Sequence, residues 1–141
     1  MSLMLIFVLL FGCGKTTPIK TTATASKTLS LSGIGTLSSK LEIREAGSTA
    51  LAVVLFIWAR LDSVTVSSSV ALYRFDTNKL DELERSESAF DLAPDSSKAV
   101  STDTTTETQR RCAVITITAT GFNSNGDEKT TFGNAQTCEK E

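Results

Sequence analysis

The sequence predicts a mainly β fold, a small antiparallel β-sandwich or barrel-like domain with one short surface helix. Two observations lead to this prediction. Residues that favour strands gather in short alternating runs, and Gly, Ser, Asn and Asp, which favour turns, separate these runs. The chain has 141 residues, of which 40% are apolar, so it can bury the core of a single domain.

The first predicted strands lie between residues 29 and 46. Residues 29–32 alternate apolar and polar side chains, and Gly33 and Gly35 then indicate a bend or a bulge. Residues 40–44 alternate again, which is typical of a strand with one buried face. We therefore expect a single β-rich domain over residues 29–141.

Residues 50–61 contain the strongest apolar run, in which ten apolar residues precede Arg60. Its aromatic and β-branched side chains favour a central strand that is buried on both faces. A buried helix is the alternative, because a continuous apolar run has no period that separates the two. Alternation resumes at Val64 and Val66, which favours the strand. The candidate core residues are Leu51, Val53, Leu55, Phe56, Ile57, Trp58, Val64, Val66, Leu72, Phe75, Ile115 and Ile117.

The segment after this run divides into three parts. Residues 70–75 are predicted to form another strand, with the serines at 67–69 as the turn before it. The polar residues at 76–78 are N-cap candidates for a short surface helix over about 78–86. Residues 86–108 are rich in Ser, Thr and Asp, so they form either a mobile loop or an edge strand.

The chain begins with a segment that differs from the rest. Residues 3–11 are nine consecutive apolar residues, a length that suits the apolar region of a secretory signal and is too short to span a bilayer. The following order, Leu10-Phe11-Gly12-Cys13, resembles the lipobox of bacterial lipoproteins. This resemblance implies that residues 1–12 are a signal peptide and that cleavage leaves a diacylglycerol on Cys13. Because Gly14 rather than Asp follows, it also implies anchoring at the outer membrane, facing the periplasm. A buried N-terminal strand is the alternative.

Residues 13–28 are predicted to be a flexible tether, because they have no hydrophobic period. Lys15, Lys20 and Lys27 are candidate membrane-proximal basic residues, since a cationic stretch beside an acyl anchor can rest on anionic headgroups. Simple solubility explains them equally well. After Leu41 the chain has 10 basic and 16 acidic residues, so we expect the folded part to be held off an anionic membrane.

A hairpin is predicted near the C-terminus. Residues 112–120 alternate as a strand, and a three-residue loop at 124–126 with Gly126 in a left-handed bulge would reverse the chain. Residues that face each other then have numbers that add up to 250, which places Cys112 opposite Cys138. A bulge at Gly133 would shift this register by one residue.

We predict a disulfide between Cys112 and Cys138. An exported chain folds where disulfides form, and lipidation of Cys13 would leave an even pair of cysteines. Two free thiols or a metal pair are the alternatives. A structural zinc site would lack ligands, because the chain has no His and the domain has no third thiol.

Composition limits the chemistry that the protein can perform. Without His, the chain lacks the commonest general base and the commonest metal ligand, so we predict no catalytic residue, no metal site and no cofactor. A net charge of −2 and a pI near 5.2 argue against nucleic acid as a partner.

These observations lead to three functional hypotheses. The first is a lipid-anchored cell-envelope protein with a non-enzymatic binding or structural role, held at the membrane by its N-terminal lipid and able to contact a protein partner. The second is a secreted or envelope inhibitor or exclusion factor that acts on another protein, which predicts an exposed apolar patch or a protruding loop within residues 86–108. The third is an envelope hydrolase that uses carboxylates or Ser, which requires a concave site with converging acidic groups.

Overall fold

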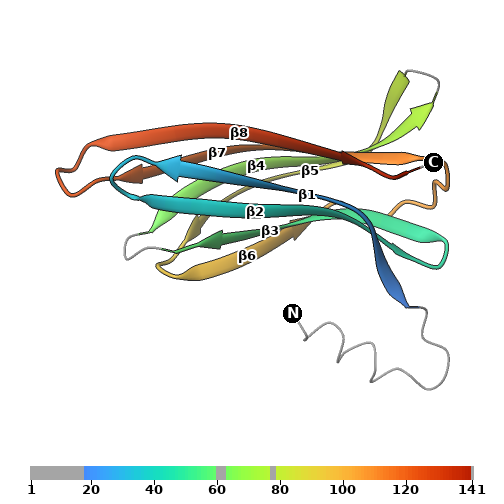
Figure 1. Cartoon of the computed structure of the whole chain (residues 1–141), viewed down its shortest axis with the longest axis horizontal. Helices are drawn as coiled ribbons and strands as arrows, with labels where there is room; N and C mark the ends of the chain where they lie inside the picture. Colours follow the sequence, from blue (N-terminus) through green and yellow to red (C-terminus); the bar gives the residue numbers. More distant parts are fainter. Residues whose placement is uncertain (1–17, 60–62, 77–78, 141) are drawn as a thin grey trace.

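Two four-stranded antiparallel sheets pack against each other (Figure 1). The computed structural model describes residues 18–59, 63–76 and 79–140. Sheet A has the strand order β1-β2-β3-β6, and sheet B has the order β5-β4-β7-β8. The strands are β1 (Ile19–Leu31), β2 (Gly35–Ala46), β3 (Thr49–Trp58), β4 (Val64–Asp76), β5 (Lys79–Leu92), β6 (Ser96–Ser101), β7 (Arg111–Phe122) and β8 (Glu128–Cys138). This architecture confirms the predicted small antiparallel β-sandwich.

Strict alternation gives each sheet one buried face. In β3, Ala52, Val54, Phe56 and Trp58 are fully buried, whereas the residues between them are more exposed. The strands β2, β4 and β7 alternate in the same way over most of their length. The inner faces meet in one apolar core, where each large side chain contributes about 1.5–3 kcal/mol on burial. The core is therefore the main source of stability.

The two sheets approach each other along β1 and β8 (Figure 1). Thr137 Oγ1 donates a hydrogen bond of 3.0 Å to the carbonyl oxygen of Thr24. A Cβ at Gly133 would collide with Leu29 Cδ2, so the lack of a side chain there lets β8 lie close to β1. The register of β7 and β8 continues through Gly133 without a shift, so the bulge considered for this position does not form.

Aromatic contacts join the sheets on the opposite side, where β5 and β6 are the edge strands. The rings of Phe56 in β3 and Phe90 in β5 have centroids 5.5 Å apart. Lys98 of β6 places its Nζ 5.4 Å from the centroid of the Phe90 ring. The core is thus covered on this side by an aromatic ring and by a lysine side chain.

The helix predicted over about 78–86 is wrong. Residues 79–92 form β5, which pairs with β4 from Lys79 to Leu92, and the described residues form no helix. Leu83 packs against the core from this strand. Pairing with β4 satisfies the backbone groups on one edge of β5, and this tertiary contact overrides the weak helix preference of the polar sequence.

The tether predicted over residues 13–28 is also wrong for its second half. β1 begins at Ile19 and pairs with β2 as far as Leu31, so residues 19–28 belong to the folded domain. Before Leu29 every residue of β1 is exposed or half-buried, which explains why the sequence shows no apolar period there. Residues 1–17, with the predicted signal peptide, Cys13 and Lys15, lie outside the described residues.

Three further predictions, for β3, for the serines at 67–69 and for residues 86–108, are confirmed only in part or are wrong. β3 is a central strand, but it is buried on one face only, since Leu55 and Ile57 are 39% and 46% exposed. The serines at 67–69 lie inside β4 rather than in a turn, because β4 continues without a break from Val64. Residues 86–108 contain the end of β5 and all of β6, so the edge-strand alternative is confirmed and the long loop is not.

The predicted core residues differ in how far they are buried. Seven of the candidates are buried as predicted, namely Phe56, Trp58, Val64, Val66, Leu72, Ile115 and Ile117. Leu51, Val53 and Phe75 are only half-buried. The core prediction therefore succeeds wherever a residue faces the other sheet.

Two buried serines should respond to substitution in opposite directions. Ser39 Oγ donates to the Lys27 carbonyl at 2.9 Å, whereas Ser68 Oγ has no partner among the described residues. A buried hydroxyl without a partner costs about 1–3 kcal/mol, and a satisfied one contributes about 0.5–1.5 kcal/mol. In urea unfolding, Ser68→Ala should raise the free energy of unfolding by about 1 kcal/mol and Ser39→Ala should lower it by about 1 kcal/mol. The exposed Ser67→Ala is the control, and a destabilised Ser68→Ala variant would contradict this account.

Candidate functional site

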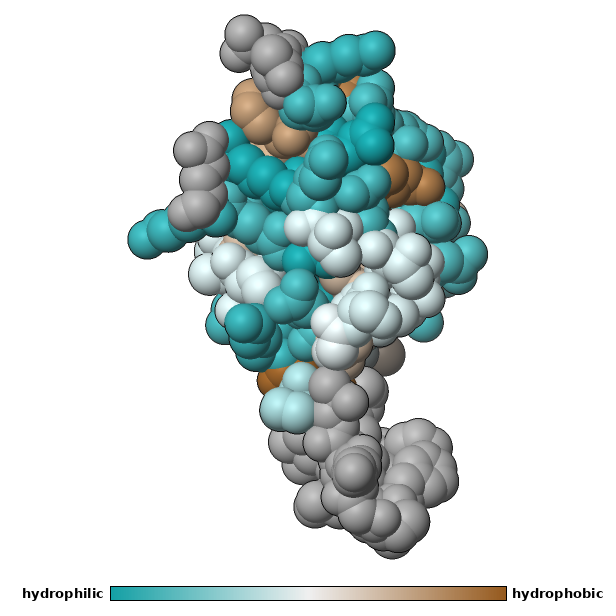
Figure 2. All heavy atoms as spheres, turned by 90° about the vertical axis from the view of Figure 1, so that its right-hand side faces the viewer, coloured by the Kyte–Doolittle hydropathy of each residue, from teal (hydrophilic) through white to brown (hydrophobic). Residues whose placement is uncertain are grey.

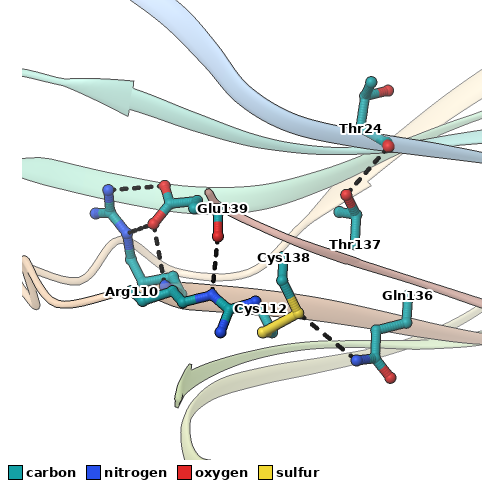
Figure 3. The surroundings of a disulfide bond; sticks show 8 residues. Thr24, Arg110, Cys112, Gln136, Thr137, Cys138 and Glu139 are labelled. Carbon is teal, nitrogen blue, oxygen red and sulfur yellow. Dashed lines mark hydrogen bonds and ion pairs between the residues drawn. A yellow bond between two sulfur atoms is a disulfide. The ribbon is translucent and has the colours of Figure 1, made fainter. Parts of the chain in front are cut away.

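The disulfide joins β7 to β8 near the C-terminus (Figure 3). Cys112 and Cys138 face each other with their Cα atoms 4.0 Å apart, in the predicted register. The turn has the predicted chemistry, because Gly126 has a φ of 83° and the Asn123 N–H donates to the Asp127 carbonyl at 3.0 Å. The disulfide and the hairpin register are therefore both confirmed.

A buried ion pair lies beside the disulfide. Arg111 and Glu139 are only 4% and 8% exposed. The Glu139 carboxylate accepts hydrogen bonds from the backbone N–H, Nε and Nη2 of Arg111, at 3.0, 2.9 and 2.9 Å. Such a two-pronged contact between guanidinium and carboxylate is stronger than a single neutral hydrogen bond. The pair therefore holds the end of β8 firmly against the start of β7.

The same pair reaches across to sheet A. Arg111 Nη2 lies 2.8 Å from Glu45 Oε2 of β2, and Thr22 Oγ1 of β1 donates to Glu139 Oε2 at 2.5 Å. The pairing of β1 with β2 shifts at Thr22, so this residue is the extra one of a bulge. Arg110 Nε also donates to the Glu139 carbonyl at 2.9 Å (Figure 3). Glu139 thus connects β7 with β1, and so connects the two sheets.

The electrostatics of this cluster favour permanent charges. Burial raises the pKa of Glu139, but hydrogen bonds from Arg111 and Thr22 outweigh it, and the pKa is lowered overall. Burial lowers the pKa of Arg111, but its bonds to Glu139 and Glu45 raise it overall. Neither Arg111 nor Glu139 changes its charge near neutral pH. Their contacts therefore hold the two sheets together rather than serve in proton transfer.

The other described carboxyls with shifted pKa values also have cationic partners. A hydrogen bond from Arg74, at 2.8 Å, holds the pKa of Asp81 below its ordinary value. Arg85, at 2.7 Å, does the same for the pKa of Glu82. Figure 2 views the end of the sandwich where the C-terminus lies, and hydrophilic residues predominate there. The Asp81 and Glu82 carboxylates thus form stabilising ion pairs, while a general acid at neutral pH would need a raised pKa.

A shallow depression of about 440 Å³ lies on sheet B. Its lining residues come from β4, β5 and β7 and carry mostly hydroxyl groups; they are Ser67, Ser68, Ser69, Glu87, Ser88, Ala89, Thr116 and Thr118. Phe132 of β8 faces Thr118 across the strands and is 72% exposed. Hydroxyl groups beside an exposed ring can bind a ligand through hydrogen bonds and apolar contact. The lining contains one carboxylate, so it does not supply the converging acidic pair that the hydrolase hypothesis requires.

The predicted basic residues do not form one patch. Lys20 is exposed near the start of β1 and lies 3.8 Å from Glu45, whereas Lys27 is half-buried, with its Cε beside the backbone of Gly133. Seven residues of an extended strand separate them, which corresponds to about 23 Å. The described residues therefore do not support a continuous cationic surface along β1.

The Arg111–Glu139 pair was not among the predicted site residues. A signal for it exists in the sequence, because 111 and 139 also add up to 250, the sum that places Cys112 opposite Cys138. The contacts with Thr22 and Glu45 have no comparable signal, since they depend on how the sheets pack.

Comparison with known proteins adds no assignment to this geometry. No protein-family model matches the sequence, and no curated protein is matched either. Over the three described ranges, no helix has the length and apolar character that crossing a bilayer would require. Nor do three or more Cys, Asp or Glu side chains of these ranges gather in a group that could hold a metal ion.

Removal of the disulfide should lower stability substantially. The two cysteines are 26 residues apart, and closing a loop of this length contributes about 3 kcal/mol in the chain-entropy account. A Cys112→Ala/Cys138→Ala double variant should therefore have a free energy of unfolding lower by about 3 kcal/mol in urea titrations. The wild type with reductant should lose a comparable amount, while reductant should leave the double variant unchanged. Equal stability of the oxidised wild type and the double variant would contradict this role.

The Glu139 contact should make stability depend on pH. Because the pKa of Glu139 is lower in the folded state, its contribution is complete above the unfolded value of about 4.3 and is lost as pH falls through the folded pKa. Glu139→Gln should lower the free energy of unfolding by about 3 kcal/mol at pH 7 and by much less at pH 3. The exposed Glu128→Gln on β8 is the matched control and should cause little change. An equal loss at both pH values for Glu139→Gln would show that its charge does not matter.

Proposed function

We propose that this protein is a lipid-anchored cell-envelope protein with a non-enzymatic binding or structural role. One observation carries the proposal. The disulfide uses Cys112 and Cys138, so of the three cysteines of the chain Cys13 alone is left. Cys13 follows the apolar run at 3–11 and Gly12, which is the position of the lipidated cysteine in the lipobox that this segment resembles.

The disulfide also supports a particular compartment. Stable disulfides form in oxidising surroundings such as the bacterial periplasm and are rare in the cytosol. Cleavage before Cys13 would leave a chain that begins with the lipidated cysteine. With Gly14 after this cysteine, we place the protein at the outer membrane, facing the periplasm.

The geometry favours binding over catalysis. The described carboxyls with shifted pKa values are held in ion pairs with Arg or Lys, and the sheet B depression offers hydroxyl groups and an exposed ring. Such a surface suits a ligand that presents polar groups along a flat face, whether a small molecule or a protein segment. Phe132 and Thr118 would be its central contacts.

Labelling with palmitate tests the anchor. The wild type should incorporate radiolabelled palmitate when expressed in bacteria, and Cys13→Ala should lose the label, because the thiol of Cys13 is the proposed site of diacylglycerol attachment. The Cys112→Ala/Cys138→Ala variant is the control and should keep the label, since it retains Cys13. A wild type without label would end this proposal.

A further inference from the structure

The outer face of sheet A carries a row of apolar side chains. Leu51, Val53, Leu55 and Ile57 alternate with the buried residues of β3, and we call them the apolar stripe. Leu55 and Ile57 are 39% and 46% exposed, although they lie in the middle of a sheet. Ala99 of β6 pairs with Leu55 and continues the apolar surface to the edge of the sheet.

Basic residues run alongside the stripe on β2. Lys40 pairs with Leu55, and Arg44 pairs with Leu51, so both project from the same face as the stripe. Glu42 lies between them and contacts both, at 3.3 Å from Lys40 Nζ and 2.7 Å from Arg44 Nε. One carboxylate is thus shared by two cations, and a net positive charge remains beside the apolar stripe.

The strands of the two sheets differ in net charge. The strands of sheet A contain five basic and two acidic residues, a net charge of +3. The strands of sheet B contain five basic and seven acidic residues, a net charge of −2. Of the five basic residues of sheet A, Lys98 pairs with the buried Phe56 and Lys27 pairs with the buried Ser39, so both lie on the inner side of the sheet. The outer face is positive through Lys40 and Arg44, against Glu42, and such a face is attracted to an anionic membrane although the net charge of the chain is negative.

We propose that the outer face of sheet A lies on an anionic phospholipid surface, with the apolar stripe among the headgroups and Lys40 and Arg44 at the phosphates. This inference rests on the proposed anchor at Cys13. Five residues lie between Cys13 and Ile19, and the six residue steps of a fully extended chain span at most ~22 Å. An anchor at Cys13 would therefore keep the start of β1, an edge strand of sheet A, within this distance of the bilayer. With the outer face of sheet A on the lipid, the depression on sheet B faces away from it.

A second copy of the chain fits this face less well than lipid does. The apolar stripe occupies one strand over seven residues, which corresponds to roughly 20 Å by 5 Å. A stable protein interface buries about 800 Å² on each partner, several times this area. A bilayer needs no such area, because the covalent anchor already supplies most of the affinity.

Quenching of introduced tryptophans by brominated lipids tests the orientation. The lipidated chain is reconstituted into phosphatidylglycerol vesicles, and Leu55→Trp on sheet A is compared with Phe132→Trp on sheet B. Both positions are exposed, and the buried native Trp58 supplies a constant background. We expect at least threefold stronger quenching for Leu55→Trp, and the difference should shrink in phosphatidylcholine vesicles or at high salt. Ile57→Trp is the second variant if Leu55→Trp folds poorly.

Charge removal provides an independent readout. Lys40→Gln should weaken the quenching of Leu55→Trp in anionic vesicles, since one basic residue near such a surface changes the population of the docked state about fivefold. Lys129→Gln, on the exposed surface of sheet B, should leave it unchanged.

Three outcomes would overturn the inference. These are equal quenching at both positions, stronger quenching for Phe132→Trp, and burial of the Leu55→Trp probe in a dimer that forms without lipid. In each case, a chain that still carries palmitate at Cys13 keeps the proposed function intact. Loss of the label is a separate result, and it would remove the anchor itself.

Discussion

The pairing register between β7 and β8 determines the disulfide, the buried ion pair beside it and the contact of β8 with β1. It places Cys112 opposite Cys138 and Arg111 opposite Glu139, so a covalent link and a buried ion pair lie side by side. A slip of one residue would separate both pairs and would turn Ala135 of the edge strand β8 away from the core. The closure of β8 against β1 depends on the same register, because it also brings Gly133 to Leu29.

Whether a strand can be predicted from the sequence depends on how many of its side chains face the core. Gly126 and the alternation of β7 define the hairpin locally, so its register could be predicted from the chain alone. By contrast, β1 and β5 are edge strands with many polar residues, and they become strands because β2 and β4 pair with them. The exposed half of the β3 run could not be recognised either, since a continuous apolar stretch does not show which face a neighbouring sheet will cover.

Only part of the candidate site, likewise, could be predicted from the sequence. The cysteine pair follows from turn chemistry, but the roles of Thr22 and Glu45 require a bulge in β1 and the packing of two sheets. The depression on sheet B requires β4, β5 and β7 to lie side by side, and the charge difference between the sheets requires each strand to be assigned to its layer. These features support the two proposals, that one face of the domain lies on a membrane and that the other binds a ligand.

The central claim is that this domain is exported, oxidised and attached to lipid through Cys13. The intact mass of the protein extracted from membranes, measured without reductant, tests all three parts at once. We expect a chain that begins at Cys13, carries the mass of a diacylglycerol, with or without a further acyl group, and lacks the two hydrogens lost in the Cys112–Cys138 bond. An unmodified chain that still begins at Met1 and contains three free thiols would contradict this expectation.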